Sequence, residues 1–247
     1  MTLLRARGLT KTFGGLYAIR DVDLDLTPGR LLGVIGPNGA GKSTLINLIT
    51  GHLRPTAGTV EIDGKVMTGA RPWRIAHAGV ARTFQIVKPF RAMTVLDNAM
   101  VPAFFHGRLS VGSARAAALE ALERVGLADR VLLTPSELSV ADARRLELAK
   151  ALAMKPRVLL LDEVLAGLRP AEIAPALELI SSLRADGLAL LMVEHVVQAI
   201  AAVSDEVLVL HHGEVLTLGP PAQVLADERV IEAYLGARYA ARNRETT

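Results

Sequence analysis

Gly36-Pro37-Asn38-Gly39-Ala40-Gly41-Lys42-Ser43 is the stretch that decides the fold of this chain. It fits the P-loop pattern G-x-x-x-x-G-K-[ST]. An apolar run over residues 31–35 predicts a strand just before it, and a helix is predicted from Lys42 to a stop at Gly51. In that order, glycines let successive backbone N–H groups point at phosphate oxygens, and the helix N-terminus adds partial positive charge. A glycine-rich turn without a ligand is the weaker alternative.

Individual residues of this stretch have distinct expected roles. Lys42 supplies a full charge to the β- and γ-phosphates, and the Ser43 hydroxyl binds Mg²⁺. The remaining residues expected to hold the nucleotide are Gly36, Asn38, Gly39, Ala40, Gly41 and Thr44.

Two acids follow a second apolar run, residues 158–161. If that run is a strand of a parallel sheet, its carboxyl end lies beside the P-loop. Asp162 is suited to hold Mg²⁺ through water, and Glu163 is suited to polarise an attacking water. Taken alone, the two acids could equally end a strand in solvent. The P-loop favours the catalytic interpretation.

The remaining pattern predicts an α/β fold. Asp63-Gly64 lies between runs 59–62 and 65–67 and predicts a hairpin, and His211-His212-Gly213 lies between runs 207–210 and 214–218. Further strands are expected at 3–9, 22–26 and 188–193, and helices at 113–125, 171–183 and 222–239, within a middle (about 94–154) that is helical throughout. Alternating strands and helices favour a largely parallel sheet into which the helical middle is inserted.

Composition sets broad limits. The chain has 247 residues, 51% of them hydrophobic and 21% charged, which is typical of a globular protein. A net charge of +3 is weak evidence for nucleic acid, and the absence of cysteine excludes disulfides. We see no signal peptide, and the longest apolar stretch (187–203) is interrupted by Glu194, His195 and Gln198, so other chains must cross any membrane at which the protein works. The polar tail 238–247 is expected to be solvated rather than to face anionic lipid.

Together these residues resemble the nucleotide-binding subunits of ABC transporters, over nearly the whole chain. The resemblance implies a P-loop NTPase (RecA-like) parallel-sheet core with an antiparallel β subdomain and an inserted helical subdomain. Residues 1–247 would form a single ABC ATPase domain. Its catalytic core and β subdomain would occupy about 1–85 and 155–247, and its helical subdomain about 86–154. The implied cofactors are ATP and Mg²⁺.

The resemblance also implies roles for residues that mean little alone. Phe13 stands where the family keeps an aromatic that stacks on adenine, although a core aromatic is the alternative. Gln85, in Arg82-Thr83-Phe84-Gln85, matches the glutamine loop that senses Mg²⁺ and the γ-phosphate. His195, after an apolar run, matches the catalytic switch histidine.

The family signature departs from its usual form. Leu138-Ser139-Val140-Ala141-Asp142 stands where most members have Leu-Ser-Gly-Gly-Gln. In the family this segment binds the γ-phosphate of ATP held by the other subunit, which assigns Ser139 and Ala141 to a nucleotide in trans. The Asp142 charge is expected to repel that phosphate. Ser139 and Asp142 are also expected to form a capping box at a helix start, and both interpretations can hold at once.

The closest likeness is to the ATPase subunits of branched-chain amino acid importers. Three stretches carry it: Arg82-Thr83-Phe84-Gln85, Arg144-Arg145-Leu146-Glu147, and residues 230–236. Such importers combine two related ATPase subunits with two transmembrane permease subunits and a periplasmic or surface solute-binding protein. The resemblance therefore implies an ATP-hydrolysing motor at the cytoplasmic face of the inner membrane, in a hetero- or homodimer, with no nucleic-acid partner.

Three alternatives stay open: a soluble ABC ATPase of translation or DNA repair, an importer motor for another small solute, and a binding-only regulatory partner. A single P-loop without a heptad run disfavours the first. Glu163 and His195 disfavour the last.

Overall fold

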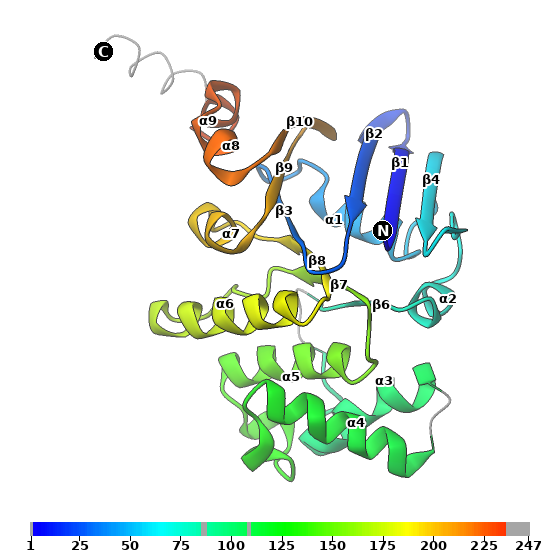
Figure 1. The fold of residues 1–247 in the computed structure, drawn as a ribbon, viewed down its shortest axis with the longest axis vertical. Coiled ribbons are helices and arrows are strands. Elements are labelled where there is room, and N and C mark those ends of the chain that lie inside the picture. The colour runs from blue at the N-terminus through cyan, green and yellow to red at the C-terminus, as the bar shows by residue number, and fades with distance from the viewer. Residues whose placement is uncertain (1, 85–87, 108–109, 236–247) are drawn as a thin grey trace.

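The computed structural model describes residues 2–84, 88–107 and 110–235. Its central element is a six-stranded sheet in the order β10-β9-β3-β8-β7-β6, parallel except for β10 (Figure 1). The strands are β3 (Leu31–Ile35), β6 (Val80–Arg82), β7 (Val158–Asp162), β8 (Ala189–Val193), β9 (Glu206–His211) and β10 (Glu214–Gly219). The predicted α/β class with a largely parallel sheet is confirmed.

A second, antiparallel sheet has the order β2-β1-β4-β5. Its strands are β1 (Leu4–Phe13), β2 (Leu16–Leu26), β4 (Ala57–Ile62) and β5 (Lys65–Val66). Asp63 and Gly64 form a two-residue turn with φ of +52° and +73°, and Ile62 pairs with Lys65. The predicted hairpin is therefore confirmed, with the positive φ values that a type I′ turn requires.

The helices are α1 (Lys42–Ile49), α2 (Pro72–His77), α3 (Val95–Gly107), α4 (Val111–Arg124), α5 (Val140–Leu152), α6 (Pro170–Ala185), α7 (Val197–Val203), α8 (Pro221–Ala226) and α9 (Glu228–Leu235). Helix α1 lies between the two sheets, and most of the other helices lie beside or below the parallel sheet (Figure 1). Helices α3, α4 and α5 pack on one another at the end of the molecule away from the antiparallel sheet. Within the described ranges, none of these helices combines the length and the apolarity needed to cross a membrane.

Successive residues of the buried strands face two different cores. In β3, Leu32 and Val34 pack in one cluster with α1 and the antiparallel sheet, whereas Leu31 and Ile35 pack in the other with α6 and α7. This alternation follows from the two-residue period of a strand. Because both faces of β3 are buried, the loop that follows it starts from the interior of the fold.

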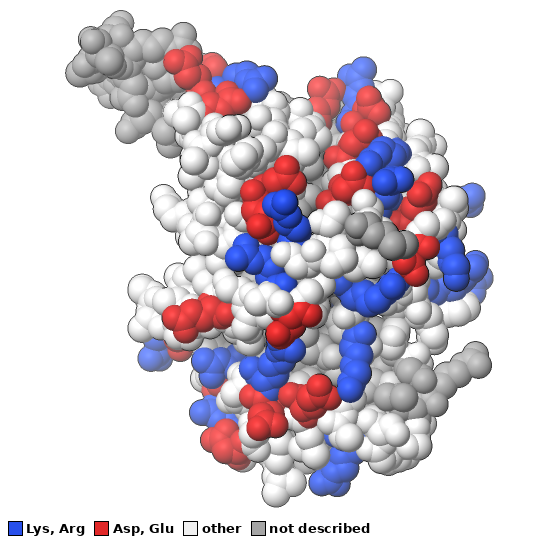
Figure 2. Space-filling model, in the orientation of Figure 1, with Lys and Arg blue, Asp and Glu red and all other residues white. Residues whose placement is uncertain are grey.

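Charges of both signs are interspersed over the face shown in Figure 2. This mixture agrees with the small net charge of +3. It is the pattern of an ordinary solvated surface.

The prediction of one helix over 222–239 is wrong for its described part. Two helices, α8 and α9, are separated by Asp227, whose backbone is extended (φ −70°, ψ 117°). Its carboxylate accepts a hydrogen bond from the Arg229 backbone N–H at 2.9 Å. An acid that binds the backbone two residues on favours a break over a continuous helix. Residues 236–239, like the tail 238–247, lie outside the described residues.

Candidate functional site

The P-loop passes through a space that admits only backbone. A Cβ atom on Gly36 would lie 2.2 Å from the Leu210 carbonyl oxygen, and one on Gly41 would lie 2.5 Å from the Ala18 carbonyl oxygen. Gly41 also has a φ of +105°. It caps α1 without a side chain, and the first turn, Lys42 to Thr44, contains no acid. The first N–H groups of α1 are thus available to an anion.

Lys42 is buried at the start of α1, with 6% of its surface exposed. Its Nζ donates hydrogen bonds to the carbonyl oxygens of Gly36 (2.6 Å) and Pro37 (3.0 Å). Burial lowers the pKa of Lys42, whereas the nearby Glu163 and Asp162 carboxylates raise it. The side chain is thereby held against the loop that it is expected to serve.

A cavity of about 450 Å³ opens over this helix start, and we call it the P-loop cavity. It is lined by Ala18, residues 38–44, Glu163 and His195. The structure therefore brings together most of the residues expected to bind phosphate with the two residues expected to be catalytic.

Glu163 and His195 meet at the edge of the P-loop cavity. Glu163 Oε1 and His195 Nε2 share a hydrogen bond of 2.6 Å. The Glu163 backbone is left-handed (φ +51°), and its N–H donates to the Val193 carbonyl oxygen at 2.9 Å. A left-handed non-glycine residue costs about 1–3 kcal/mol and is typical of functional sites. The strain turns the chain at the end of β7 and directs this carboxylate to the cavity.

Asp162 lies deeper, with 4% of its surface exposed. Burial raises the pKa of its carboxyl group, and the charge of Arg82, which is 3.0 Å away, opposes that rise. Asp162 and Ser43 line a second cavity of about 390 Å³, together with Asn47, Arg82, Phe84, Lys88, Glu147 and Lys150. A hydroxyl and a carboxylate on one cavity wall are the oxygen ligands that Mg²⁺ prefers, so these residues fit the ion.

Two residues near the site were not singled out for a role from the sequence. One is Arg82, which had served only to support a resemblance. The other is Glu194, 2% exposed, whose Oε1 accepts a hydrogen bond from the Leu165 N–H at 2.7 Å. Burial raises the pKa of Glu194. The only available signal was an acid within an apolar stretch.

Phe13 does not line either cavity. Phe13, at the end of β1, is 49% exposed, and Lys11 Nζ lies 5.0 Å from its ring centroid. Among the described residues of the hairpin formed by β1 and β2, Ala18 is the one that lines the P-loop cavity. Gln85 lies outside the described residues.

The signature segment forms the start of α5, away from both cavities described above. Ser139 caps the helix: its Oγ accepts from the Asp142 N–H at 3.1 Å and donates to Asp142 Oδ2 at 2.5 Å. Ala141 is buried and faces a different cavity between α5 and α6. Ser139 and Ala141 are expected to contact a nucleotide held by another subunit, and this contact stays a prediction.

The Asp142 carboxylate does not present a bare charge. Its side chain is 7% exposed and pairs with Arg130 and Arg145. The expected repulsion of a phosphate is therefore wrong in its premise, because two arginines neutralise the carboxylate. The N-cap part of the capping interpretation is confirmed, because the Ser139 Oγ accepts from the Asp142 N–H; the reciprocal bond of a capping box, from the Ser139 N–H to the Asp142 carboxylate, stays a prediction.

Comparison with known proteins agrees with this geometry. The family model described as ABC transporter matches residues 19–166, and one described as branched-chain amino acid ATP-binding cassette transporter matches residues 214–240. The high-affinity branched-chain amino acid transport ATP-binding protein LivG of Escherichia coli (strain K12) is 40% identical, covering 95% of this chain and 98% of that protein. The protein of the same description named BraF, from Pseudomonas aeruginosa, is 36% identical over the same shares.

Solved structures give the same result. A nucleotide-free ATP-binding cassette from an ABC transporter superposes with a TM-score of 0.86 at 29% identity, covering 95% of this chain and 99% of that one. An ATP-binding cassette solved in its ADP conformation superposes with a TM-score of 0.86 at 30% identity, covering 96% and 99%.

Proposed function

We propose, from the premise that this chain belongs to the ABC transporter family, that it is the ATP-hydrolysing subunit of a branched-chain amino acid importer. The observation that carries the catalytic part is the P-loop cavity, where Lys42 at a helix start lies with the Glu163–His195 pair. The amino acid specificity is supported by the names of the relatives and by the match over residues 214–240.

The residues of the P-loop cavity divide the work. The N–H groups of residues 38–44 and the Lys42 ammonium would bind the phosphates of ATP. Mg²⁺, held by Ser43 and Asp162, would neutralise charge on the phosphate oxygens. Glu163 would orient and polarise a water, and His195, hydrogen-bonded to Glu163, would position that carboxylate. Phe13 would stack on adenine, and Gln85 would contact Mg²⁺.

A second ATPase subunit would complete the site. Val140, in the first turn of α5, is 63% exposed beside the capping residue Ser139. We propose that this helix start, with Ser139 and Ala141, meets a nucleotide held by a related subunit or by a second copy.

A permease surface is supported by exposed aromatic side chains. Trp73 on α2, Phe104 and Phe105 on α3, and Phe84 and Phe90 between them are between 40% and 72% exposed. Helices α2 and α3 contact each other, and the His77 and His106 rings lie 5.3 Å apart between them. Exposed apolar groups of this size are typical of interaction sites. We propose that a permease binds here, at the cytoplasmic face of the membrane, and that residues 86–154 form the helical subdomain.

Assembly and transport test the proposal. The chain should co-purify with two permeases and a related ATPase. Vesicles with the complex in their membrane and ATP in their lumen should take up leucine when the solute-binding protein is present outside, and vesicles without ATP should not. The chain alone should be a weak ATPase whose specific activity falls on dilution, since the site needs two subunits. High specific activity at every dilution would contradict the shared site. Uptake of another small solute instead of leucine would retain the motor and reject the substrate.

A further inference from the structure

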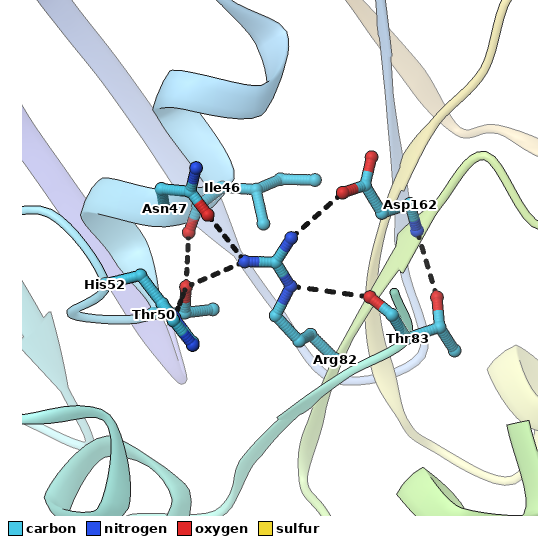
Figure 3. Close-up of polar contacts among 7 residues, drawn as sticks. All are labelled: Ile46, Asn47, Thr50, His52, Arg82, Thr83 and Asp162. Atoms are coloured by element: carbon cyan, nitrogen blue, oxygen red, sulfur yellow. Dashed lines mark hydrogen bonds and ion pairs between the residues drawn. The ribbon is translucent and has the colours of Figure 1, made fainter. Parts of the chain in front are cut away.

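The guanidinium of Arg82 joins three elements in the interior (Figure 3). Its side chain is 10% exposed. Nη1 donates to Oδ1 of Asn47 on α1 at 2.7 Å and to Oγ1 of Thr50, the C-cap of α1, at 3.4 Å. On β7, Nη2 donates to Asp162 Oδ2 at 3.0 Å. A single side chain thus ties the P-loop helix to the strand that ends in the two acids.

Asp162 is held at two points, by Arg82 at the end of β6 and by Thr83, the residue that follows it. Besides the Arg82 contact to its carboxylate, its backbone N–H donates to Thr83 Oγ1 at 3.1 Å. One carboxylate oxygen is therefore engaged by Arg82, and the orientation of the other is fixed with it. A planar guanidinium can hold two acceptors in a fixed relation, which an ammonium cannot.

The Arg82 side chain bridges α1 and β7, the same two elements that supply the expected ligands of the cation, Ser43 and Asp162. Ser43 and Asn47 are four residues apart on α1 and therefore share a helix face, and both line the second cavity with Asp162. The hydrogen bonds of Arg82 connect Asn47 to Asp162, and Ser43 faces Asp162 across the same cavity. Phe84 covers this arrangement, with its ring centroid 4.7 Å from the guanidinium carbon.

We propose that Arg82 is a positioning residue for the cation site: it braces α1 against β7 and so fixes the Asp162 carboxylate relative to the Ser43 hydroxyl. The inference rests on the proposed ATPase function. Arg82 and Asp162 cancel each other's charge, so the pair does not repel a cation, and its contribution is geometric. Groups that orient a metal ligand typically change metal affinity by about 10–100-fold.

The test compares the dissociation constant of a fluorescent ATP analogue with Mg²⁺ and with EDTA. The dissociation constant in EDTA divided by the dissociation constant in Mg²⁺ measures the coupling between nucleotide and Mg²⁺. In Arg82→Gln this ratio should fall by about 10-fold or more. Arg82→Lys should restore little of the ratio, because it keeps the charge and loses the fork. The control Thr50→Val removes one of the two guanidinium contacts of 3.4 Å, together with the hydrogen bonds of the Thr50 hydroxyl to the Ile46 carbonyl oxygen and to His52, and should keep the parent ratio.

A double-mutant cycle shows whether Arg82 acts through Asp162. In an Asp162→Asn background, Arg82→Gln should leave the ratio where Asp162→Asn alone put it. Replacing both members of the buried pair also removes the unpaired charge, so this variant should fold if Arg82→Gln does not. An additive effect, an unchanged or increased ratio in Arg82→Gln, or full recovery in Arg82→Lys would overturn the inference. A parent chain that binds no nucleotide under either condition would instead overturn the proposed function.

Discussion

Replacing Asp142 by Asn removes one charge and little else. The asparagine has nearly the same shape and can still accept the Ser139 hydroxyl. The Asp142 side chain is 7% exposed, and its partners Arg130 and Arg145 are 38% and 40% exposed. The variant therefore isolates the ion pairs from the cap.

The exposure of the partners decides the magnitude. A hydrogen bond to a buried charged group contributes about 1.5–3 kcal/mol. Both arginines can turn to water when the carboxylate is lost, which reduces the loss toward the ~1 kcal/mol of an exposed pair. We expect a loss of about 1–2 kcal/mol in the free energy of unfolding. For a chain of this length, that lowers Tm by roughly 2–8 °C.

The assay is thermal unfolding of the purified chain, with ATPase turnover of the assembled complex beside it. Asp129→Asn is a matched control, since Asp129 is 78% exposed and lies 3.9 Å from the same Arg130. Asp129→Asn should leave Tm nearly unchanged. Turnover at the partner's site should not rise in Asp142→Asn, because the charge it removes is already neutralised. Equal Tm values for the two variants, or a several-fold rise in turnover, would refute the reasoning.

Three further substitutions test the site. Lys42→Ala should abolish ATP binding or hydrolysis, because the loop backbone cannot replace a full charge at the phosphates; nucleotide affinity and turnover measure this. Glu163→Gln should bind ATP and hydrolyse it about 10²–10⁴-fold more slowly, since the water loses its base; single-turnover kinetics measure this. Glu194→Gln should unfold at a higher temperature than the parent where pH lies well above the raised pKa of Glu194, and should lose that advantage as pH falls below the ordinary pKa of a glutamate.

The sign of the Glu194 effect follows from its raised pKa. The folded state binds the proton more tightly than the unfolded state, so the stabilising contribution is present at low pH and is lost as pH rises through the folded pKa. A Tm difference independent of pH would contradict it.

Lys65→Ala, on the exposed strand β5, is the control for Lys42→Ala and should keep parent affinity. A Glu163→Gln variant that turns over at the parent rate would show that another group activates the water.

The best sequence predictions came from elements whose signals are local. Residues 31–35 form β3 and α1 begins at Lys42, both as predicted, because glycines and a buried run mark both boundaries. The hairpin at His212-Gly213 is also confirmed, with both residues at positive φ. Hairpin turns depend on two residues, so they can be read without knowing what they pack against.

Apart from the helix break at Asp227, which is local, the failures involve contacts between distant segments. Strand β6 has three residues, too few for a periodic signal, and only its pairing with β7 makes it a strand. The same pairing places Arg82 against Asp162, 80 positions away. The neutralisation of Asp142 depends on Arg130, in a turn whose position no local pattern specifies. The sequence shows which residues carry a charge, a helix cap or a hydroxyl group. It does not show which of these side chains contact one another in the fold.

The close approach of Gly36 to the Leu210 carbonyl oxygen also bears on how such a chain could decay. Any side chain at position 36 would collide with the backbone of β9, whether or not ATP is ever bound. A descendant that ceased to hydrolyse nucleotide could lose the Lys42 ammonium or the Glu163 carboxylate and still fold. It could not lose Gly36 without moving a central strand. A P-loop sequence that keeps its first glycine and lacks its lysine would therefore indicate a chain that has lost ATP hydrolysis but keeps the fold.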